Sequence, residues 1–285
     1  MPEIQDQFRD ANKQRREWVE AQLGKRPSNV FSEKDISPPI NPYRSPNLGE
    51  SWPEYRVGSY DYYAEILEQR WDKYLTKIER EMLKQHKYGG MSQVVNLTAQ
   101  GFFEIPEEII EYDMYSIQAN SAMREFLAIG IPTDARAQLV ASHLESAAWR
   151  QAGISANYLK DSVIDPSVYN MVNDAMQSML TIPGFGRPEF IEAMSSVMSP
   201  ERARMIARTE ATRARNQGTK ELAEVMQSQG MNVLEIWMIA QNTNVCGDCE
   251  SLNGKIKGNG WTDYPPLHPN CDCDVFLEVV EVPIQ

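Results

Sequence analysis

Hydrophobic residues recur at three- and four-residue steps along most of the chain, which predicts a mainly helical protein. The strongest pattern covers residues 59–88, where charged residues lie beside an apolar stripe. That stripe consists of Tyr60, Tyr63, Leu67, Trp71, Tyr74, Ile78 and Met82. Gly89 and Gly90 follow it and favour the end of a helix. At about 1.5 Å per residue such a helix is roughly 45 Å long, which indicates an elongated helical body.

Proline at helix starts and glycine after helix ends delimit the other predicted helices. These cover residues 106–129, 132–151, 166–180, 188–198 and 199–229. The last has Ser199 as its N-cap, Pro200 in its first turn and Gly230 after its end. Its predicted buried stripe is made of small and aliphatic residues, namely Ala203, Ala207, Ala214, Gly218, Leu222 and Val225. Small residues at these positions let another element approach closely.

The first part of the chain has a different character. Residues 1–27 carry a weak apolar stripe and predict a short helix, whereas residues 28–57 are interrupted by prolines and predict an extended arm. Four aromatic residues of the arm favour docking on a partner over a solvated linker. They are Phe31, Tyr43, Trp52 and Tyr55.

After Gly230 the hydrophobic period changes from that of a helix to that of a strand. Residues 233–241 alternate in the manner of a strand, residues 252–256 predict a turn into a short strand, and residues 274–282 predict a third. The chain is therefore predicted to comprise an arm over residues 1–57, a helical domain over 58–198 and a small α+β module over 199–285, which begins with the long helix.

All four cysteines and one of the three histidines of the chain fall within this module. The spacing C-x2-C followed by H-x2-C-x-C is typical of a metal site, and a closed tetrahedral Zn²⁺ takes four such ligands. The candidate ligands are Cys246, Cys249, His268, Cys271 and Cys273. Cys246, Cys249 and Cys271 are the firmest of these, and the fourth ligand is His268 or Cys273. Such an ion would stabilise the fold of this segment, which is rich in turn residues.

Two disulfides are the alternative for the four cysteines. The polar N-terminus carries no secretory signal, so a reducing compartment is expected, and this favours zinc. Catalysis at the site is not expected, because no H-E-x-x-H motif occurs and a closed site leaves no coordination position for water.

One face of the helix over 199–229 carries polar residues that could be interpreted as a catalytic cluster. They are Arg208, Glu210, Arg213 and Gln217. Glu and Arg at three- and four-residue offsets pair routinely, so contacts that hold the helix to the sheet are the favoured interpretation. With no nucleophile–base pair in view, the sequence does not predict an enzyme.

The net charge of −12 weighs against a general DNA coat, because such proteins need an excess of Lys and Arg. Lys220, Lys255 and Lys257 offer some local charge, so DNA contact stays an option. No apolar run reaches the roughly 18–20 residues of a membrane helix, and no membrane association is expected.

Two motifs in the C-terminal third resemble those of the phage Mu F-like head morphogenesis proteins, also called minor capsid or minor head proteins. The first is the helix that carries Ala207-Arg208-Thr209-Glu210 and Ala214-Arg215-Asn216-Gln217-Gly218. The second runs from Cys246-Gly247-Asp248-Cys249 through Leu252-Asn253-Gly254-Lys255 to the segment Pro265-Pro266-Leu267-His268-Pro269-Asn270-Cys271-Asp272-Cys273. The resemblance covers about residues 199–282. Asp272 departs from it, since a basic residue is common there in that family.

This resemblance implies a structural component of the virion head, made in the host cytoplasm and incorporated during procapsid assembly, with no enzymatic activity. The implied partners are the portal protein and the major capsid or scaffolding protein, with self-association as a further option. The alternative is a zinc-containing DNA-binding adaptor that guides genome packaging or ejection.

Overall fold

The structure, a computed structural model, describes residues 2–23, 30, 31, 35, 54–128, 143, 147, 148, 150–158, 160–182, 186–239 and 245–280. This part of the chain is mostly helical and contains one two-stranded sheet, which confirms the mainly α fold. None of the helices described is both long enough and apolar enough to cross a membrane.

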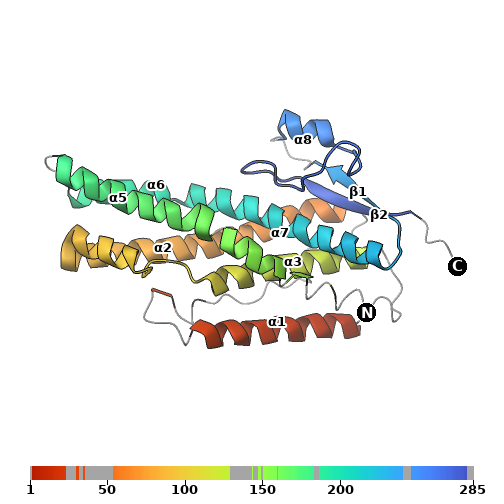
Figure 1. Ribbon diagram of the computed structural model, residues 1–285, viewed down its shortest axis with the longest axis horizontal. Helices are drawn as coiled ribbons and strands as arrows, with labels where there is room; N and C mark the ends of the chain where they lie inside the picture. Colours follow the sequence, from red (N-terminus) through yellow and green to blue (C-terminus); the bar gives the residue numbers. More distant parts are fainter. Residues whose placement is uncertain are drawn as a thin grey trace.

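Three long helices form the centre of the molecule: α2 (Glu54–Ala99), α3 (Glu107–Ala128) and α7 (Pro200–Ser228). They lie side by side along the longest axis, with α7 packed on both α2 and α3 (Figure 1). The helix predicted over 59–88 begins earlier, at Glu54. The expected break is observed at Gly90, whose φ of 67° and ψ of −166° interrupt α2. The predicted stripe is buried from Tyr63 to Met82.

At the left-hand end of Figure 1, α5 (Asp165–Thr181) and α6 (Arg187–Val197) cover this body. Both helices confirm the prediction to within about two residues at each end. A π-helical turn, η3 (Lys160–Ile164), precedes α5. Arg202 at the start of α7 donates to the carbonyl of Val163 and to the hydroxyl of Ser167, which ties α7 to these elements. Most of the helix predicted over 132–151 lies outside the described residues.

Close approach between α3 and α7 depends on small residues. A Cβ added at Gly218 would lie 2.5 Å from the carbonyl oxygen of Gln118, so only glycine fits this contact. Ser121 of α3 donates to the carbonyl of Arg215 on α7 over 3.3 Å. The small stripe predicted on this helix is buried as expected, except for the half-buried Val225.

A buried polar cluster joins α2 to α3. Arg70 forms an ion pair with Asp113, and the hydroxyl of Tyr74 donates to the same carboxylate over 3.2 Å. Burial raises the pKa of Asp113, while the charge of Arg70 opposes that shift. A buried charge that lost its partner would be costly, so the cluster favours one specific arrangement of the two helices.

The helix expected within residues 1–27 is observed as α1 (Pro2–Leu23), which packs on α3. Three described residues of the following segment dock on the body. Val30 donates its N–H to the carbonyl of Phe102, Phe31 meets Tyr74 edge-on at 5.7 Å, and Asp35 pairs with Lys77 over 2.6 Å. Phe31, one of the four aromatic residues expected to favour docking on a partner, is thus buried within its own chain. Tyr43 and Trp52 lie outside the described residues.

The C-terminal module consists of β1 (Val233–Met238), α8 (Gly247–Leu252) and β2 (Asp274–Val279). The strands pair antiparallel, from Val233 opposite Val279 to Met238 opposite Asp274. The turn predicted within residues 252–256 is observed, but the short strand after it is reduced to isolated bridges, of Ile256 with Ile236 and of Lys257 with Trp261. Gly254 and Gly258 on either side adopt positive φ, so turns limit this pairing.

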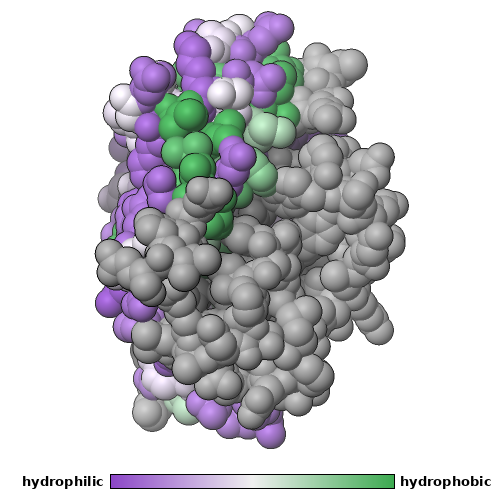
Figure 2. Space-filling model, turned by 90° about the vertical axis from the view of Figure 1, so that its right-hand side faces the viewer, coloured by the Kyte–Doolittle hydropathy of each residue, from purple (hydrophilic) through white to green (hydrophobic). Residues whose placement is uncertain are grey.

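The module lies over α7 at the right-hand end of the body (Figure 1). The module therefore packs on one end of an elongated helical body. Seen from that end, the surface shows a patch of hydrophobic residues between hydrophilic ones (Figure 2).

Candidate metal centre

The cysteines and His268 come from two segments that the small sheet brings together. Cys246 caps the N-terminus of α8, where its sulfur accepts from the N–H of Cys249 over 3.4 Å. His268, Cys271 and Cys273 lie in the loop that leads into β2. Because β1 and β2 are paired, the segment after β1 and the segment before β2 meet at the same end of the sheet.

The structure gathers the five candidate ligands into two overlapping triads. Cys246, Cys249 and His268 form one, and Cys249, Cys271 and Cys273 form the other. Within each triad the ligand atoms lie within 4.8 Å of one another. The cluster could therefore hold a metal ion, and Cys249 is common to both triads.

Several of these distances match a tetrahedral zinc site. With Zn–S near 2.3 Å and Zn–N near 2.0 Å, the sulfurs lie about 3.8 Å apart and sulfur and nitrogen about 3.5 Å apart. The sulfurs of Cys249 and Cys271 are 3.8 Å apart. Nε2 of His268 lies 3.5 Å from the Cys249 sulfur and 3.1 Å from the Cys246 sulfur. All four cysteines are free thiols, in contrast to the disulfide alternative.

The orientation of His268 suits a ligand. Its Nδ1 lies 2.8 Å from the carbonyl oxygen of Pro269, and this contact raises the pKa of the imidazole. A proton on Nδ1 leaves Nε2 with a free lone pair, and Nε2 is the atom that faces the cysteines. Metal-bound histidines commonly donate their other ring nitrogen to a carbonyl in this way.

The thiols differ in how readily they ionise. A hydrogen bond from Cys273 lowers the pKa of Cys271 to about 5, and the same bond raises the pKa of Cys273 itself. Burial raises the pKa of Cys249 to about 12, whereas the backbone N–H of Cys249 lowers the pKa of Cys246. Without a cation the cluster therefore shares protons among its sulfurs, and a divalent ion would stabilise them as thiolates.

The helix α7 contacts the ligand loop through residues that the sequence did not single out for this role. Asn216 and Arg215 donate to the carbonyl oxygen of Cys273 over 3.0 and 3.3 Å. Arg215 also pairs with Asp274 over 3.5 Å, and both side chains are buried. The available signal was that Arg215 and Asn216 lie directly beside Ala214 of the predicted buried stripe, because polar groups near a buried face need partners.

Three of the four residues predicted to join α7 to the sheet make contacts along α7 or with Tyr158. Glu210 pairs with Arg213 on the same helix over 2.9 Å, and the guanidinium of Arg213 lies 4.9 Å from the ring centre of Tyr158. Gln217 donates to Glu221 one turn further along α7. The fourth, Arg208, is half-buried. Burial raises the pKa of Glu210, and the charge of Arg213 opposes this shift.

A hollow of about 270 Å³ lies between this face of α7 and the ligand loop. Tyr158, Met205 and Leu267 line it and are partly exposed, and Glu210 and His268 also face it. The hollow is mostly apolar and its buried carboxylate is already paired. This arrangement gives no nucleophile–base pair within it.

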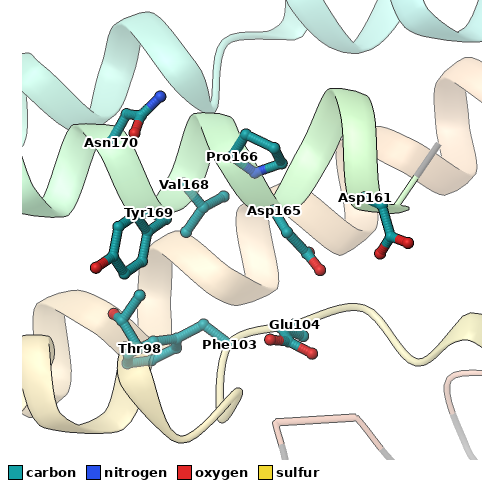
Figure 3. Close-up of a pocket in the computed structure, with 9 residues that line it drawn as sticks. All are labelled: Thr98, Phe103, Glu104, Asp161, Asp165, Pro166, Val168, Tyr169 and Asn170. Atoms are coloured by element: carbon teal, nitrogen blue, oxygen red, sulfur yellow. The ribbon is translucent and has the colours of Figure 1, made fainter. Parts of the chain in front are cut away.

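A second hollow, of about 400 Å³, lies in the body between α5, the end of α2 and the segment that follows α2 (Figure 3). Figure 3 shows the carboxylates of Glu104, Asp161 and Asp165 on one side and the ring of Tyr169 on the other. Lys160 bridges Glu104 and Asp165 over 3.1 and 3.0 Å. These ion pairs attach the segment after α2 to α5.

Two of the three lysines considered for DNA contact have partners within the module or along α7, whereas the third, Lys255, is exposed. Lys257 donates to Glu235 and to the hydroxyl of Tyr264, and its ammonium lies over the Tyr264 ring. Lys220 lies 3.7 Å from a carboxylate oxygen of Glu224. Lys257 is therefore held within the module, whereas Lys220 makes a partly exposed pair on its own helix.

Together these features define a small α+β module with a cysteine–histidine cluster, mounted on a helical body. Residues 170–276 match the family described as "Phage Mu protein F like protein". The match confirms the resemblance found in the two motifs and extends it to most of α5 and all of α6. Because this is a family of structural phage head proteins, the match indicates head morphogenesis and a place in the virion. No curated protein and no solved structure matches the chain.

Proposed function

We propose that the chain is a minor head protein that acts by binding during procapsid assembly, with a zinc ion fixing its C-terminal module to the helical body. The family match carries this proposal, because residues 170–276 contain all of α7 and all five candidate ligands. A binding role also suits Glu210 and Arg213, which pair with each other. We expect Glu210→Ala to change the free energy of unfolding, and we expect no enzymatic activity that depends on Glu210.

For the ion, the proposed ligands are Cys246, Cys249, His268 and Cys271. The short distances from Nε2 of His268 to two sulfurs support His268 as the fourth ligand. Cys273 then serves as a hydrogen-bond donor to the Cys271 thiolate, a role for which its effect on the Cys271 pKa is suited. Such neighbours of a ligand commonly orient it and tune the metal.

Substitution with Co²⁺ tests this ligand set, because its absorption reports both the geometry and the number of thiolates. We expect a tetrahedral spectrum with three thiolates for the unaltered chain. Cys273→Ser should keep that spectrum, whereas Cys271→Ser should lose one thiolate contribution. Loss of a thiolate in Cys273→Ser, with His268→Asn unchanged, would instead identify Cys273 as the fourth ligand.

The proposed partners are the portal protein and the major capsid or scaffolding protein, at the portal vertex. The body carries well-exposed apolar side chains suited to such contacts, among them Tyr88, Ile154 and Ile182. Co-purification with the portal protein and mass spectrometry of purified heads test the proposal. Full-length protein that never enters particles would contradict it.

A zinc-containing DNA adaptor is the weaker candidate, since Lys220 and Lys257 are engaged within the chain. A gel-shift assay at low salt distinguishes the two, because phosphate contacts strengthen as salt falls. We expect no binding at low salt. Strong binding that weakens steeply with salt would favour the adaptor.

A further inference from the structure

The side-chain amide of Asn216 makes three hydrogen bonds at the boundary between α7 and the metal centre, and these use both of its donors. Its Nδ2 donates to the carbonyl of Thr212 over 2.9 Å and to the carbonyl of Cys273 over 3.0 Å. Its Oδ1 accepts from the N–H of Val275 over 2.9 Å. The residue is fully buried. These three contacts fix the amide in one orientation.

The pair of contacts to Cys273 and Val275 has the pattern of a β-ladder. Asn216 meets the carbonyl of one residue and the N–H of the residue two positions later, as a neighbouring strand would. It thereby satisfies backbone groups at the start of β2, where the chain leaves the ligand loop. The carbonyl it binds belongs to a candidate ligand, two residues beyond Cys271.

Two other residues of α7 hold the same stretch of chain. Thr209 accepts from the N–H of Asn270 over 3.1 Å, directly before Cys271. Arg215 donates to the carbonyl of Cys273 and pairs with Asp274. The ligand loop is thus attached to α7 on both sides of Cys271, and Asn216 supplies the most completely bonded of these attachments.

We propose that Asn216 is a positioning residue for the metal centre: it holds the Cys271–Cys273 loop in the ligating geometry and so couples metal binding to the docking of the module on α7. This inference rests on the metal centre proposed above. A loop that is already held in place loses less conformational freedom when the ion binds, so its affinity is higher. By linkage, a bound ion in turn strengthens the docking of β2 on α7.

The test compares full-length Asn216→Ala and Asn216→Leu with the unaltered chain. Leucine has the same branching and the same number of side-chain heavy atoms but makes no hydrogen bond, so it removes the bonding without leaving a cavity. Gln217→Ala is the matched control, because that amide bonds Glu221 on the same helix. Zn²⁺ affinity is measured by competition with a chromophoric chelator, and the melting temperature of each metal-free protein is measured in parallel.

We expect both Asn216 variants to bind Zn²⁺ about 10- to 100-fold more weakly, the usual effect of removing a group that orients a ligand. Gln217→Ala should bind as the unaltered chain does. The metal should also raise the melting temperature of the Asn216 variants less than that of the unaltered chain.

Each other outcome has a distinct meaning. Unaltered affinity in both variants, with only the metal-free melting temperature lowered, would make Asn216 purely structural and overturn the inference. An equal loss in Gln217→Ala would also overturn it. If the unaltered chain binds no Zn²⁺, the proposed metal centre itself fails and takes this inference with it. If Asn216→Ala does not fold, the leucine variant provides the measurement.

Discussion

The helical body and the C-terminal module are stabilised in different ways. The body buries large side chains such as Trp71 on α2, Tyr112 on α3 and Phe190 on α6, so its stability is spread over many contacts. The module has a two-stranded sheet and a small core around Trp237 and Val275. An isolated two-stranded sheet is at best marginally stable. With the ion proposed above, a few sulfur and nitrogen ligand atoms would stabilise the module in the way that an apolar interior stabilises the body.

Removal of the ion is expected to have the largest effect and to separate the two regions. Zinc binding is worth about 10–16 kcal/mol in small finger peptides, which compares with about 5–15 kcal/mol for the stability of a whole domain. Chelation, or Cys249→Ser, which affects both triads, should remove amide protection from residues 232–285 and spare residues 59–88. Hydrogen exchange measures this, and Ser251→Ala, at an exposed position of α8, is the control. Unchanged exchange in the module would contradict the comparison.

A substitution in the core of the helical body should weaken the body and leave the metal centre unchanged. Trp71→Ala removes a fully buried indole from α2 and should lower the free energy of unfolding by about 3–5 kcal/mol. Denaturant titration measures that loss. The Zn²⁺ affinity of the folded protein should stay the same, because Trp71 lies on α2 and makes no contact with the cluster among those described. A matching loss of affinity would show that the two regions are not independent.

A smaller effect is expected where α7 meets α3. Gly218→Ala places a methyl group 2.5 Å from the carbonyl oxygen of Gln118, so the helices must shift apart. Overpacking of this kind typically costs about 1–3 kcal/mol. Thermal unfolding measures it, with the exposed Ser228→Ala on the same helix as control. Equal melting temperatures for Gly218→Ala and the unaltered chain would argue against the close contact.

The smallest expected effect is a difference in how the stability of the body and the binding of the ion depend on pH. Burial, together with Glu107 and Glu108, raises the pKa of Glu111 from 4.5 to about 7. Between these pH values the folded state binds more protons than the unfolded one, so the body loses stability as pH rises from about 4.5 to about 7. The metal centre responds in the opposite direction, because protons compete with the ion for its ligands as pH falls.

Melting curves of the full-length protein at several pH values measure how the stability of the body responds. Glu111→Gln should flatten the dependence between pH 4.5 and 7, whereas Glu201→Gln at an exposed position should leave it in place. A body that instead gains stability over the same rise in pH would contradict the assignment to Glu111.

The sequence predicted the helices well because their apolar stripes are long and their ends carry proline, serine or glycine. It also identified the five candidate ligands, because cysteine spacing is a local signal. It missed α8, and it predicted a strand near residues 252–256 where isolated bridges form, since short elements depend on tertiary contacts. The role of Asn216 could not be predicted, because its hydrogen bonds reach residues about 60 positions away in the chain. For Phe31, the pattern showed that the ring would dock but not on which surface.

Native mass spectrometry of the purified full-length protein tests most directly whether an ion holds the module. It gives the mass of each chain before and after treatment with a chelator, together with the oxidation state of the cysteines. We predict one zinc ion per chain, four reduced or metal-bound cysteines and release of the ion on chelation. A metal-free chain whose mass shows two disulfides would contradict the account.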